Sequence, residues 1–401
     1  MSSKGFKAEM SSDYDTDWHE DLGRIEKTLK ISPEERMSIK VNINCFRQGS
    51  PPRDGIAKLT VGLRDAYTVF QHELQRARDG ACSFTLVNGD YGAGKSHCLY
   101  LLREIALNKN FLVSFLTLSQ RECPLYDLGV VYSQIVRRIE GKKAFGIVTI
   151  QDILELWAEC VRRKGQNSRE AAVCQVKTLH PDFQKALAEY LCPSFPGAAE
   201  LVKRWLVGDD STKRTASHLK VEMRPTNEQA LEMMKQLGRL VRTIGFEGLV
   251  VLLDEAEAIP SYSGSSKQKS CYNNLCRLLE RENRVPHCYF VYATTPLFFR
   301  KSFGYIPVAE QAHEVLDLPT LSRTEYIALG CIIRNLYRTG EGWKGWDSSF
   351  NDQQIKRCVE SYMKIHPEGS KPRDFVRSLV SALDICAPNP NKKLSNVFSP
   401  K

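Results

Sequence analysis

The sequence lacks the features that mark membrane, disulfide-rich and fibrous proteins. Its longest apolar runs, such as Phe111–Leu118, fall well short of the about 20 residues that cross a bilayer, so we expect no membrane contact. No C-x-x-C pair occurs among the 13 cysteines and no signal-like start precedes them, which predicts reduced thiols in the cytoplasm. With Gly 25, Pro 18 and no internal repeat, collagen-like and low-complexity chains are excluded. No Ser/His/Asp or Cys/His arrangement typical of a covalent hydrolase stands out.

The remaining composition is that of an ordinary globular protein. Of the 401 residues, 42% are hydrophobic and 26% are charged, and a chain of this length has room for two or three structural units. The formal charge of +9 is compatible with binding to nucleic acid, and it is equally common in proteins that never bind one. Residues 1–24 are acidic and rich in serine, which predicts a flexible tail.

Short apolar runs alternate with longer helical stretches from residue 83 onward, a pattern typical of a parallel sheet covered by helices. The predicted strands are Ser83–Val87, Leu112–Leu118, Leu249–Leu253, Tyr289–Ala293 and, more weakly, Glu314–Leu318. About 130 residues separate the second strand from the third. That is too many for one crossover, so we expect a helical insertion at about 120–245. Its predicted helices are Val148–Arg163, Pro181–Tyr190, Ala198–Leu206 and Asn227–Ile244.

The segments on either side of this sheet region are predicted to be helical. Within 25–82, Ser32-Pro33-Glu34-Glu35 predicts a helix start, Gln48–Pro52 breaks the chain, and Ala66–Arg78 predicts an amphipathic helix. After the fifth strand we expect a C-terminal helical lid at 321–387 and then a polar tail at 388–401. The predicted lid helices are Arg323–Tyr337, Asp352–Tyr362 and Arg373–Ile385.

The first predicted strand runs into a full match to the phosphate-binding pattern G-x-x-x-x-G-K-S. Glycines let backbone N–H groups turn toward phosphate oxygens, and the following helix adds the positive end of its dipole. Lys95 is placed to reach the β- and γ-phosphates, and Ser96 to offer a hydroxyl to Mg²⁺. The candidate nucleotide-binding residues are Gly89, Asp90, Tyr91, Gly92, Ala93, Gly94, Lys95 and Ser96.

An acidic pair follows the third predicted strand. Asp254, at the carboxyl end of a buried strand, is placed to hold Mg²⁺ directly or through water, and Glu255 to orient and deprotonate an attacking water. The alternative is a strand end with two solvated acids. ATPase relatives that only bind nucleotide often lack the second acid, so Glu255 favours hydrolysis.

Further polar residues are candidates for sensing the γ-phosphate. Thr294, in preference to Thr295, ends the fourth strand where a hydroxyl can serve as sensor 1, although Thr-Thr-Pro is also an ordinary turn. Arg373 opens the last lid helix, either as sensor 2 or as a solvated side chain. P-loop ATPases with these sensors usually need a cation from a neighbouring subunit at the γ-phosphate, which would imply a homo-oligomer. The candidates for this arginine finger, each also readable as a surface charge, are Arg281, Arg284 and Arg300.

Together these motifs resemble those of the P-loop ATP-binding proteins of BREX bacteriophage-exclusion systems, of the kind called BrxD, which are similar to origin-recognition and Cdc6-type AAA+ ATPases. The segments that carry the resemblance are Phe46–Pro52, Leu59–Gly62, Gly89–His97, Lys203–Gly208, Gly248–Glu257, Tyr272–Leu275 and Ala293–Phe299. The resemblance implies an ATPase of a prokaryotic anti-phage defence system that works with partner proteins on double-stranded DNA. It also implies that Val61 and Gly62 line the adenine pocket, and it adds His97 to the nucleotide-binding set.

The combined interpretation is an α/β P-loop NTPase of AAA+ type, with a parallel sheet flanked by helices, a large helical insertion and a C-terminal helical lid. Residues 83–320 form the predicted ATPase core. ATP and Mg²⁺ are the predicted cofactors, and the predicted partners are ATP, other defence proteins, DNA and further copies of the chain. Two other functions stay open: a nucleotide-dependent scaffold with negligible turnover, and a DNA translocase.

Overall fold

The structure is a computed structural model of the chain. It describes residues 32–144, 146–163, 169–208, 212–255, 259, 262–296, 312–341, 350–366, 371–389 and 391–399. The predicted flexible tail at 1–24 and the candidate finger Arg300 lie outside the described residues.

Seven strands form one sheet in the order β4-β3-β2-β5-β6-β1-β7. They are β1 (Cys82–Asn88), β2 (Leu112–Thr117), β3 (Ile139–Lys143), β4 (Gly146–Thr149), β5 (Leu249–Asp254), β6 (Cys288–Thr294) and β7 (Glu314–Asp317). β2, β5, β6, β1 and β7 run parallel, whereas β3 and β4 form an antiparallel hairpin at one edge. All five predicted strands are confirmed. The predicted α/β class, with a mostly parallel sheet flanked by helices, is confirmed with them.

The central strands carry apolar side chains on both faces, because helices cover the sheet on both sides. On β5, Val250 belongs to the core that α3 and α4 close, whereas Val251 belongs to the core shared with the insertion. The helices on the first face are α3 (Arg64–Arg78) and α4 (Lys95–Asn108), preceded by the short η1 (Ile56–Leu59).

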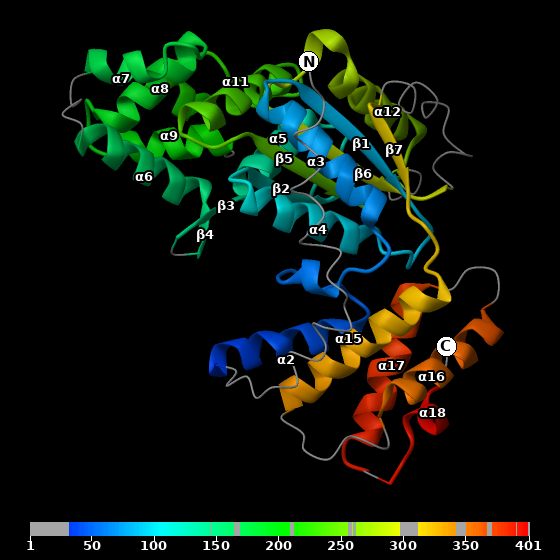
Figure 1. Cartoon of the computed structure of the whole chain (residues 1–401). Helices are drawn as coiled ribbons and strands as arrows, with labels where there is room; N and C mark the ends of the chain where they lie inside the picture. Colours follow the sequence, from blue (N-terminus) through cyan, green and yellow to red (C-terminus); the bar gives the residue numbers. More distant parts are fainter. Residues whose placement is uncertain are drawn as a thin grey trace, which may run out of the picture.

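Between β2 and β5 the chain inserts the β3–β4 hairpin and a group of helices, drawn largely in green in Figure 1. These helices are α5 (Leu128–Arg137), α6 (Ile150–Arg163), α7 (Arg169–Gln175), α8 (Pro181–Leu191), α9 (Ala198–Val207), α10 (Thr212–Leu219) and α11 (Ala230–Thr243). Their apolar sides share one core with a face of the sheet. The elements α12 (Ser265–Leu279) and η3 (Arg281–Asn283) lie between β5 and β6.

The hairpin corrects the predicted start of one insertion helix. The sequence predicts a helix from Val148, but Gly146–Thr149 pairs with β3 as a strand and α6 begins at Ile150. Thr149 and Asp152 cap α6 reciprocally: the backbone N of Asp152 donates to Thr149 Oγ1 at 3.3 Å, and the backbone N of Thr149 donates to Asp152 Oδ2 at 2.8 Å. Pairing with β3 therefore overrides the helical periodicity at these residues.

A second body, the lid, lies below the sheet in Figure 1. It contains α15 (Arg323–Glu341), α16 (Asp352–Ile365), α17 (Pro372–Cys386), α18 (Leu394–Val397) and α2 (Pro33–Gln48). These helices share an apolar core that is distinct from the two cores on the faces of the sheet. The three helices predicted for this region are confirmed as α15, α16 and α17.

The helix α2 packs against the C-terminal helices of the lid although it precedes the sheet in the sequence. Its predicted start is confirmed, because Ser32 Oγ accepts from the Glu35 backbone N at 3.1 Å and Glu35 Oε2 accepts from the Ser32 backbone N at 3.0 Å. Near its end, Arg47 forms a bidentate pair with Asp384 of α17 at 2.9 and 2.7 Å. The predicted segment 25–82 is therefore divided, with α2 on the lid and α3 on the sheet.

The predicted polar tail at 388–401 takes part in the lid core. Within its described residues, Leu394 of α18 is fully buried and Phe398 is 7% exposed. The ring of Phe398 lies 6.0 Å from that of Phe375 on α17. Three apolar residues in a short polar segment, Leu394, Val397 and Phe398, are too weak a pattern to predict this docking, which depends on α16 and α17 lying beside the segment.

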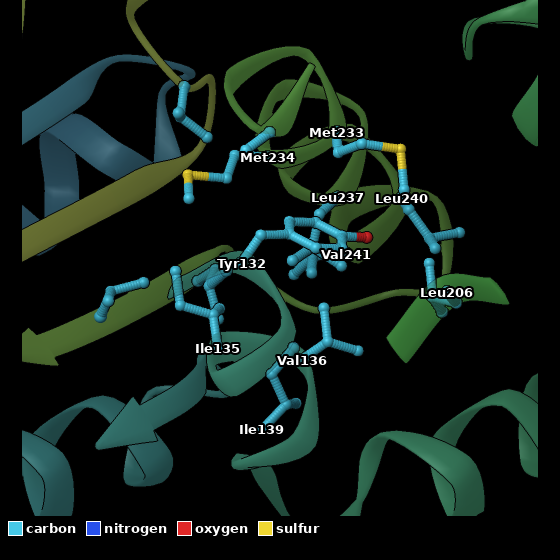
Figure 2. Close-up of a cluster of buried hydrophobic side chains, with 14 of the residues drawn as sticks. Tyr132, Ile135, Val136, Ile139, Leu206, Met233, Met234, Leu237, Leu240 and Val241 are labelled. Carbon is cyan, nitrogen blue, oxygen red and sulfur yellow. The ribbon is translucent and has the colours of Figure 1, made fainter. Parts of the chain in front are cut away.

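One buried polar group in the insertion core has no polar neighbour to bond. Figure 2 shows the ring of Tyr132, on α5, among side chains of α11 that include Leu240 and Val241. Tyr132 is fully buried, and its hydroxyl has no hydrogen-bond partner among the described residues. By contrast, the equally buried Tyr289 of β6 donates its hydroxyl proton to Thr85 Oγ1 at 2.9 Å.

These two tyrosines predict opposite effects of the same substitution. Tyr132→Phe removes an unpaired hydroxyl and should raise the free energy of unfolding by about 1 kcal/mol, whereas Tyr289→Phe removes a buried hydrogen bond and should lower it by about 1 kcal/mol. Urea unfolding measures both changes as shifts of the midpoint at constant slope. An equal loss of stability in both variants would contradict the description of the Tyr132 hydroxyl as unpaired.

Candidate functional site

The phosphate loop joins β1 to α4 and turns through two glycines with positive φ, Gly92 at 84° and Gly94 at 103°. Glycine adopts this conformation without strain. The Lys95 ammonium lies across the loop and donates to the carbonyl oxygens of Gly89 at 3.0 Å and Asp90 at 3.3 Å. Lys95 is 7% exposed. The loop thus gathers a buried cation and the N-terminus of α4 at one point, an arrangement suited to phosphate.

A hydrogen bond connects the phosphate loop to the end of β5. Ser96 Oγ donates to Asp254 Oδ2 at 2.7 Å, and the backbone N of Glu255 donates to Asp254 Oδ1 at 2.9 Å. Glu255 is exposed and has a φ of 62°, a strained value for a residue with a side chain and one that is common at functional sites. Hydroxyl and carboxylate oxygens are ligands that Mg²⁺ prefers, so Ser96 and Asp254 fit the predicted metal.

Thr294 ends β6 beside the phosphate loop. It pairs in register with Asn88, the last residue of β1, and its carbonyl oxygen accepts from the backbone N of Gly89 at 3.2 Å. Its side chain is fully buried, yet Oγ1 has no hydrogen-bond partner in the described part of the chain. A buried unpaired hydroxyl costs about 1–3 kcal/mol. Thr294 is not among the residues that line the cleft holding Lys95, Ser96 and Asp254.

The lid reaches the phosphate loop through the first turn of α17. Arg373 Nη1 donates to the Tyr91 hydroxyl at 2.6 Å, and its guanidinium carbon lies 5.0 Å from the centroid of the Tyr91 ring. The backbone N of Arg373 donates to the carbonyl oxygen of Gly92 at 3.4 Å. One turn later, Arg377 packs against Gly49, where its Cδ lies 2.5 Å from the position that a Cβ would take. The predicted sensor arginine therefore lies at the phosphate loop.

A cleft of about 280 Å³ lies between the sheet and the lid. One wall is polar and is made by the phosphate loop with Asp254 and Glu255. The other wall is apolar and comes from the end of α2, the segment before α3, and the lid. Its residues are Phe46, Pro51, Leu59, Val61, Leu63, Pro319, Leu321, Leu329, Ile332, Ile333 and Val376. An apolar wall facing phosphate-binding groups suits a nucleotide, which has an apolar base face and a charged end.

Of the two residues that the resemblance places beside the adenine, only Val61 is in the cleft wall. Gly62 has a φ of 73°, and a Cβ added there would lie 2.6 Å from Leu321 Cδ2 on the lid side of the cleft. The Gly62 backbone therefore packs directly on the lid, where a larger residue would push the two bodies apart.

His97 follows the phosphate loop and also lines the cleft. Its Nε2 lies 2.9 Å from Thr60 Oγ1, and the Thr60 hydroxyl donates its proton to the carbonyl oxygen of Ile56 at 2.9 Å. Because that proton is already used, His97 Nε2 must be the donor. Burial lowers the pKa of the His97 imidazole from 6.5 to about 4, so the ring is neutral at pH 7.

The segment that carries Thr60 and Val61 is held in place by α4. The backbone N of Ile56 donates to Glu104 Oε2 at 2.8 Å. The neighbouring Arg103 is almost fully buried; it donates to Asp54 Oδ1 at 2.9 Å and also pairs with Glu140 of β3. The same helix that begins at the phosphate loop thus fixes one end of the apolar wall.

The described arginine-finger candidates lie away from this cleft. Arg281 belongs to η3 and Arg284 follows it, both before β6 begins at Cys288. Thr294 ends β6, and the 7 residues of this strand separate its two ends by about 20 Å. Arg281 and Arg284 are therefore near the amino ends of the parallel strands, whereas the cleft of their own chain lies at the carboxyl ends.

Several residues of the site could not be found from the motifs. Thr60, Arg377 and the lid residues Leu329 and Ile332 belong to no phosphate-binding pattern. Thr60 lies in a segment that carries the family resemblance, without a role of its own there. For the others the signal is indirect: Leu329 and Ile332 repeat at helical spacing, and Arg377 lies one turn after Arg373. Helical spacing predicts a buried face, but it does not say that the face borders a ligand.

No helix in the described ranges is both long and apolar enough to span a membrane. A group of three or more His, Cys, Asp or Glu side chains placed to hold a metal ion is likewise absent from the described residues.

The sequence matches the family described as BREX system ATP-binding protein BrxC/D over residues 31–401. No curated protein matches it. Among solved structures, it is similar to the ORC2 protein of Aeropyrum pernix in its ADPNP-ADP complexes, with 14% identity, coverage of 83% of this chain and 65% of that chain, and a TM-score of 0.44. It is also similar to the ORC1 protein of Aeropyrum pernix in complex with DNA, with 13% identity, coverage of 86% of this chain and 66% of that chain, and a TM-score of 0.42. The chain thus spans slightly less than two thirds of the length of these structures.

The lowered pKa of His97 predicts a pH-dependent contribution to stability. As the pH falls from 7 to 5, the His97 imidazole becomes protonated in the unfolded chain but stays mostly neutral in the folded one. The contribution of His97 to the free energy of unfolding should therefore fall by on the order of 2 kcal/mol. His97→Gln keeps a donor for Thr60 but cannot titrate, so its stability should fall less over the same range. Urea unfolding at pH 7 and pH 5 measures the difference.

The comparison isolates His97 because His287 and His313, whose pKa values are also lowered by burial, are present in both proteins. The same change of stability with pH in the two proteins would show that His97 is protonated as readily in the folded state as in the unfolded one.

Proposed function

Because the chain belongs to the family of BREX system ATP-binding proteins, as its motifs predict, we propose that it hydrolyses ATP with Mg²⁺ in the cleft between sheet and lid. It would do so as a component of a prokaryotic defence against bacteriophages. The observation that carries the proposal is the 2.7 Å contact between Ser96 and Asp254, which joins the phosphate loop to the strand that ends next to Glu255.

The chain's own residues can hold the phosphates and the metal. Lys95 now donates to two backbone carbonyl oxygens at the loop, and its ammonium is within the loop that phosphates would enter. Ser96 and Asp254 would hold Mg²⁺, which when bound neutralises charge on the β- and γ-phosphates. The apolar wall would take the base and exclude water from that side.

Glu255 is the residue that we assign to the hydrolytic step. It directly follows Asp254, and its positive φ turns the chain immediately after the metal-binding carboxylate. An exposed carboxylate at this position can accept a proton from a water molecule that approaches the γ-phosphate. The unpaired hydroxyl of Thr294 would orient that water or bind a γ-phosphate oxygen.

We further propose that the protein acts as an oligomer, with other defence proteins, on DNA. Arg281 and Arg284 lie at the sheet edge opposite their own cleft, where a cation can serve a neighbouring copy but not its own nucleotide. The formal charge of +9 is compatible with a polyanionic partner. In the alternative, a scaffold, ATP binding alone would assemble the defence complex.

The role of Glu255 predicts a separation of binding from turnover. Glu255→Gln should bind ATP as the wild type does and hydrolyse it at least about 100-fold more slowly, because the amide cannot accept the proton. The matched control is Glu314→Gln, which neutralises an exposed acid on β7 and should leave turnover unchanged. Hydrolysis is followed against protein concentration, with and without double-stranded DNA.

The results of this experiment distinguish an ATPase from a nucleotide-dependent scaffold. A rate per subunit that rises with protein concentration supports a shared site in an oligomer, and a DNA-stimulated rate that falls steeply with salt supports action on DNA. Tight ATP binding with no turnover by wild type under any of these conditions would replace the ATPase with the scaffold.

The unpaired hydroxyl of Thr294 predicts a loss of activity without a loss of stability. Thr294→Val should reduce kcat roughly 10- to 100-fold, because it would remove the hydroxyl that we assign to the γ-phosphate or the attacking water, and it should leave the thermal midpoint unchanged or raised. The matched control is Thr85→Val on β1, which removes the acceptor of the Tyr289 hydroxyl and should lower stability with little effect on kcat. Wild-type kinetics in Thr294→Val would remove Thr294 from the mechanism.

A further inference from the structure

We propose that Tyr91 is a positioning residue that holds Arg373 of the lid against the phosphate loop, so that the lid arginine can read the γ-phosphate. The inference rests on the proposed function, because it assigns a means of nucleotide discrimination to the same site. Tyr91 occupies a variable position of the G-x-x-x-x-G-K-S pattern, and the pattern alone gives no reason for an aromatic residue there.

Tyr91 holds the guanidinium in two ways at once. Its hydroxyl accepts a hydrogen bond from Arg373 Nη1 at 2.6 Å, and its ring faces the guanidinium carbon at 5.0 Å. The hydrogen bond fixes the direction of one edge of the guanidinium, and the cation–π contact fixes its distance from the loop. Yet Tyr91 is 62% exposed, so it adds little to the apolar cores and its main contact is with the lid.

The next residue of the loop anchors the backbone of the same arginine. The carbonyl oxygen of Gly92 accepts from the backbone N of Arg373 at 3.4 Å. A Cβ on Gly92 would lie 3.4 Å from Lys371 Cβ and 3.6 Å from Arg373 Cβ, so the first turn of α17 rests directly on the loop. Consecutive loop residues therefore hold both the backbone and the side chain of Arg373.

The geometry leaves Arg373 able to bind a ligand. A guanidinium has five N–H donors, and the Tyr91 hydroxyl uses one of them. Arg373 lines the cleft together with Lys95, and its Nε faces Gly49, 3.0 Å from the position that a Cβ would take there. Arg377, one turn further along α17, packs its Cδ on the same glycine, 2.5 Å from the position of a Cβ, so the end of α2 borders both arginines.

The proposal predicts a selective loss of affinity for the triphosphate. Without Tyr91 the arginine is no longer held over the loop, so Tyr91→Ala should weaken binding of a non-hydrolysable ATP analogue by about 5- to 10-fold, the size of one lost hydrogen bond and cation–π contact. The affinity for ADP, which has no γ-phosphate, should stay within about 2-fold of wild type. Tyr91→Phe keeps the ring, so its affinity for the analogue should lie between the affinities of wild type and Tyr91→Ala.

The experiment is a double-mutant cycle on the full chain, with Tyr91→Ala, Arg373→Ala and the combination, and it measures the affinities for ADP and for the analogue by fluorescence titration. In the Arg373→Ala background, Tyr91→Ala should no longer change the ratio of the two affinities. The ADP affinity is also the test of folding, since a misfolded variant would lose both nucleotides.

Two results would overturn the proposal. One is an unchanged ratio in Tyr91→Ala; the other is an equal change of the ratio with and without Arg373, which would mean that Tyr91 acts on the nucleotide independently of the arginine. Failure of the wild type to bind either nucleotide would instead overturn the proposed function itself, so the two failures are distinguishable.

Discussion

Parallel pairing of β6 with both β1 and β5 places the candidate phosphate-binding groups at one edge of the sheet. β1 leads into the phosphate loop, β5 ends in Asp254 and β6 ends in Thr294. The three strands are neighbours that point the same way, so distant parts of the sequence meet there: Ser96 and Asp254 are 158 positions apart and 2.7 Å from each other. The lid packs over this same edge, and the apolar wall of the cleft faces the phosphate loop as a result.

The range of each interaction decides how much of the fold could be predicted from the sequence. The central strands are near-continuous apolar runs and the phosphate loop is contiguous, so local patterns identify both. The helix α2 and its capping residues Ser32 and Glu35 are equally local. Its attachment to the lid is not, because the Arg47–Asp384 pair joins residues 337 positions apart. The β3–β4 hairpin is local, since Glu140 and Thr149 pair only 9 positions apart; it is missed because β3 has a single strongly apolar residue, Ile139, and gives no strand pattern.

The residues of the candidate site that local motifs contain could also be predicted, whereas the contacts between distant segments could not. The motifs identify which residue types can bind phosphate and metal, and Lys95, Ser96, Asp254 and Glu255 are found in this way. They cannot identify contacts between bodies. Tyr91 and Arg373 are 282 positions apart, and Thr60 reaches His97 only because α4 holds the segment after α2. The first contact depends on how the lid docks and the second on how the segment after α2 packs on α4, and no local pattern specifies either.

Two of the buried hydroxyls that lack a hydrogen-bond partner among the described residues, those of Tyr132 and Thr294, differ in meaning because their surroundings differ. Tyr132 lies in the insertion core among Leu240 and Val241 (Figure 2), where no polar ligand can reach it, so its hydroxyl is only a cost in stability. Thr294 has the same unpaired state, but its own carbonyl oxygen bonds the first glycine of the phosphate loop. A hydroxyl that has no partner within the protein can bind a ligand at the loop without first breaking a bond.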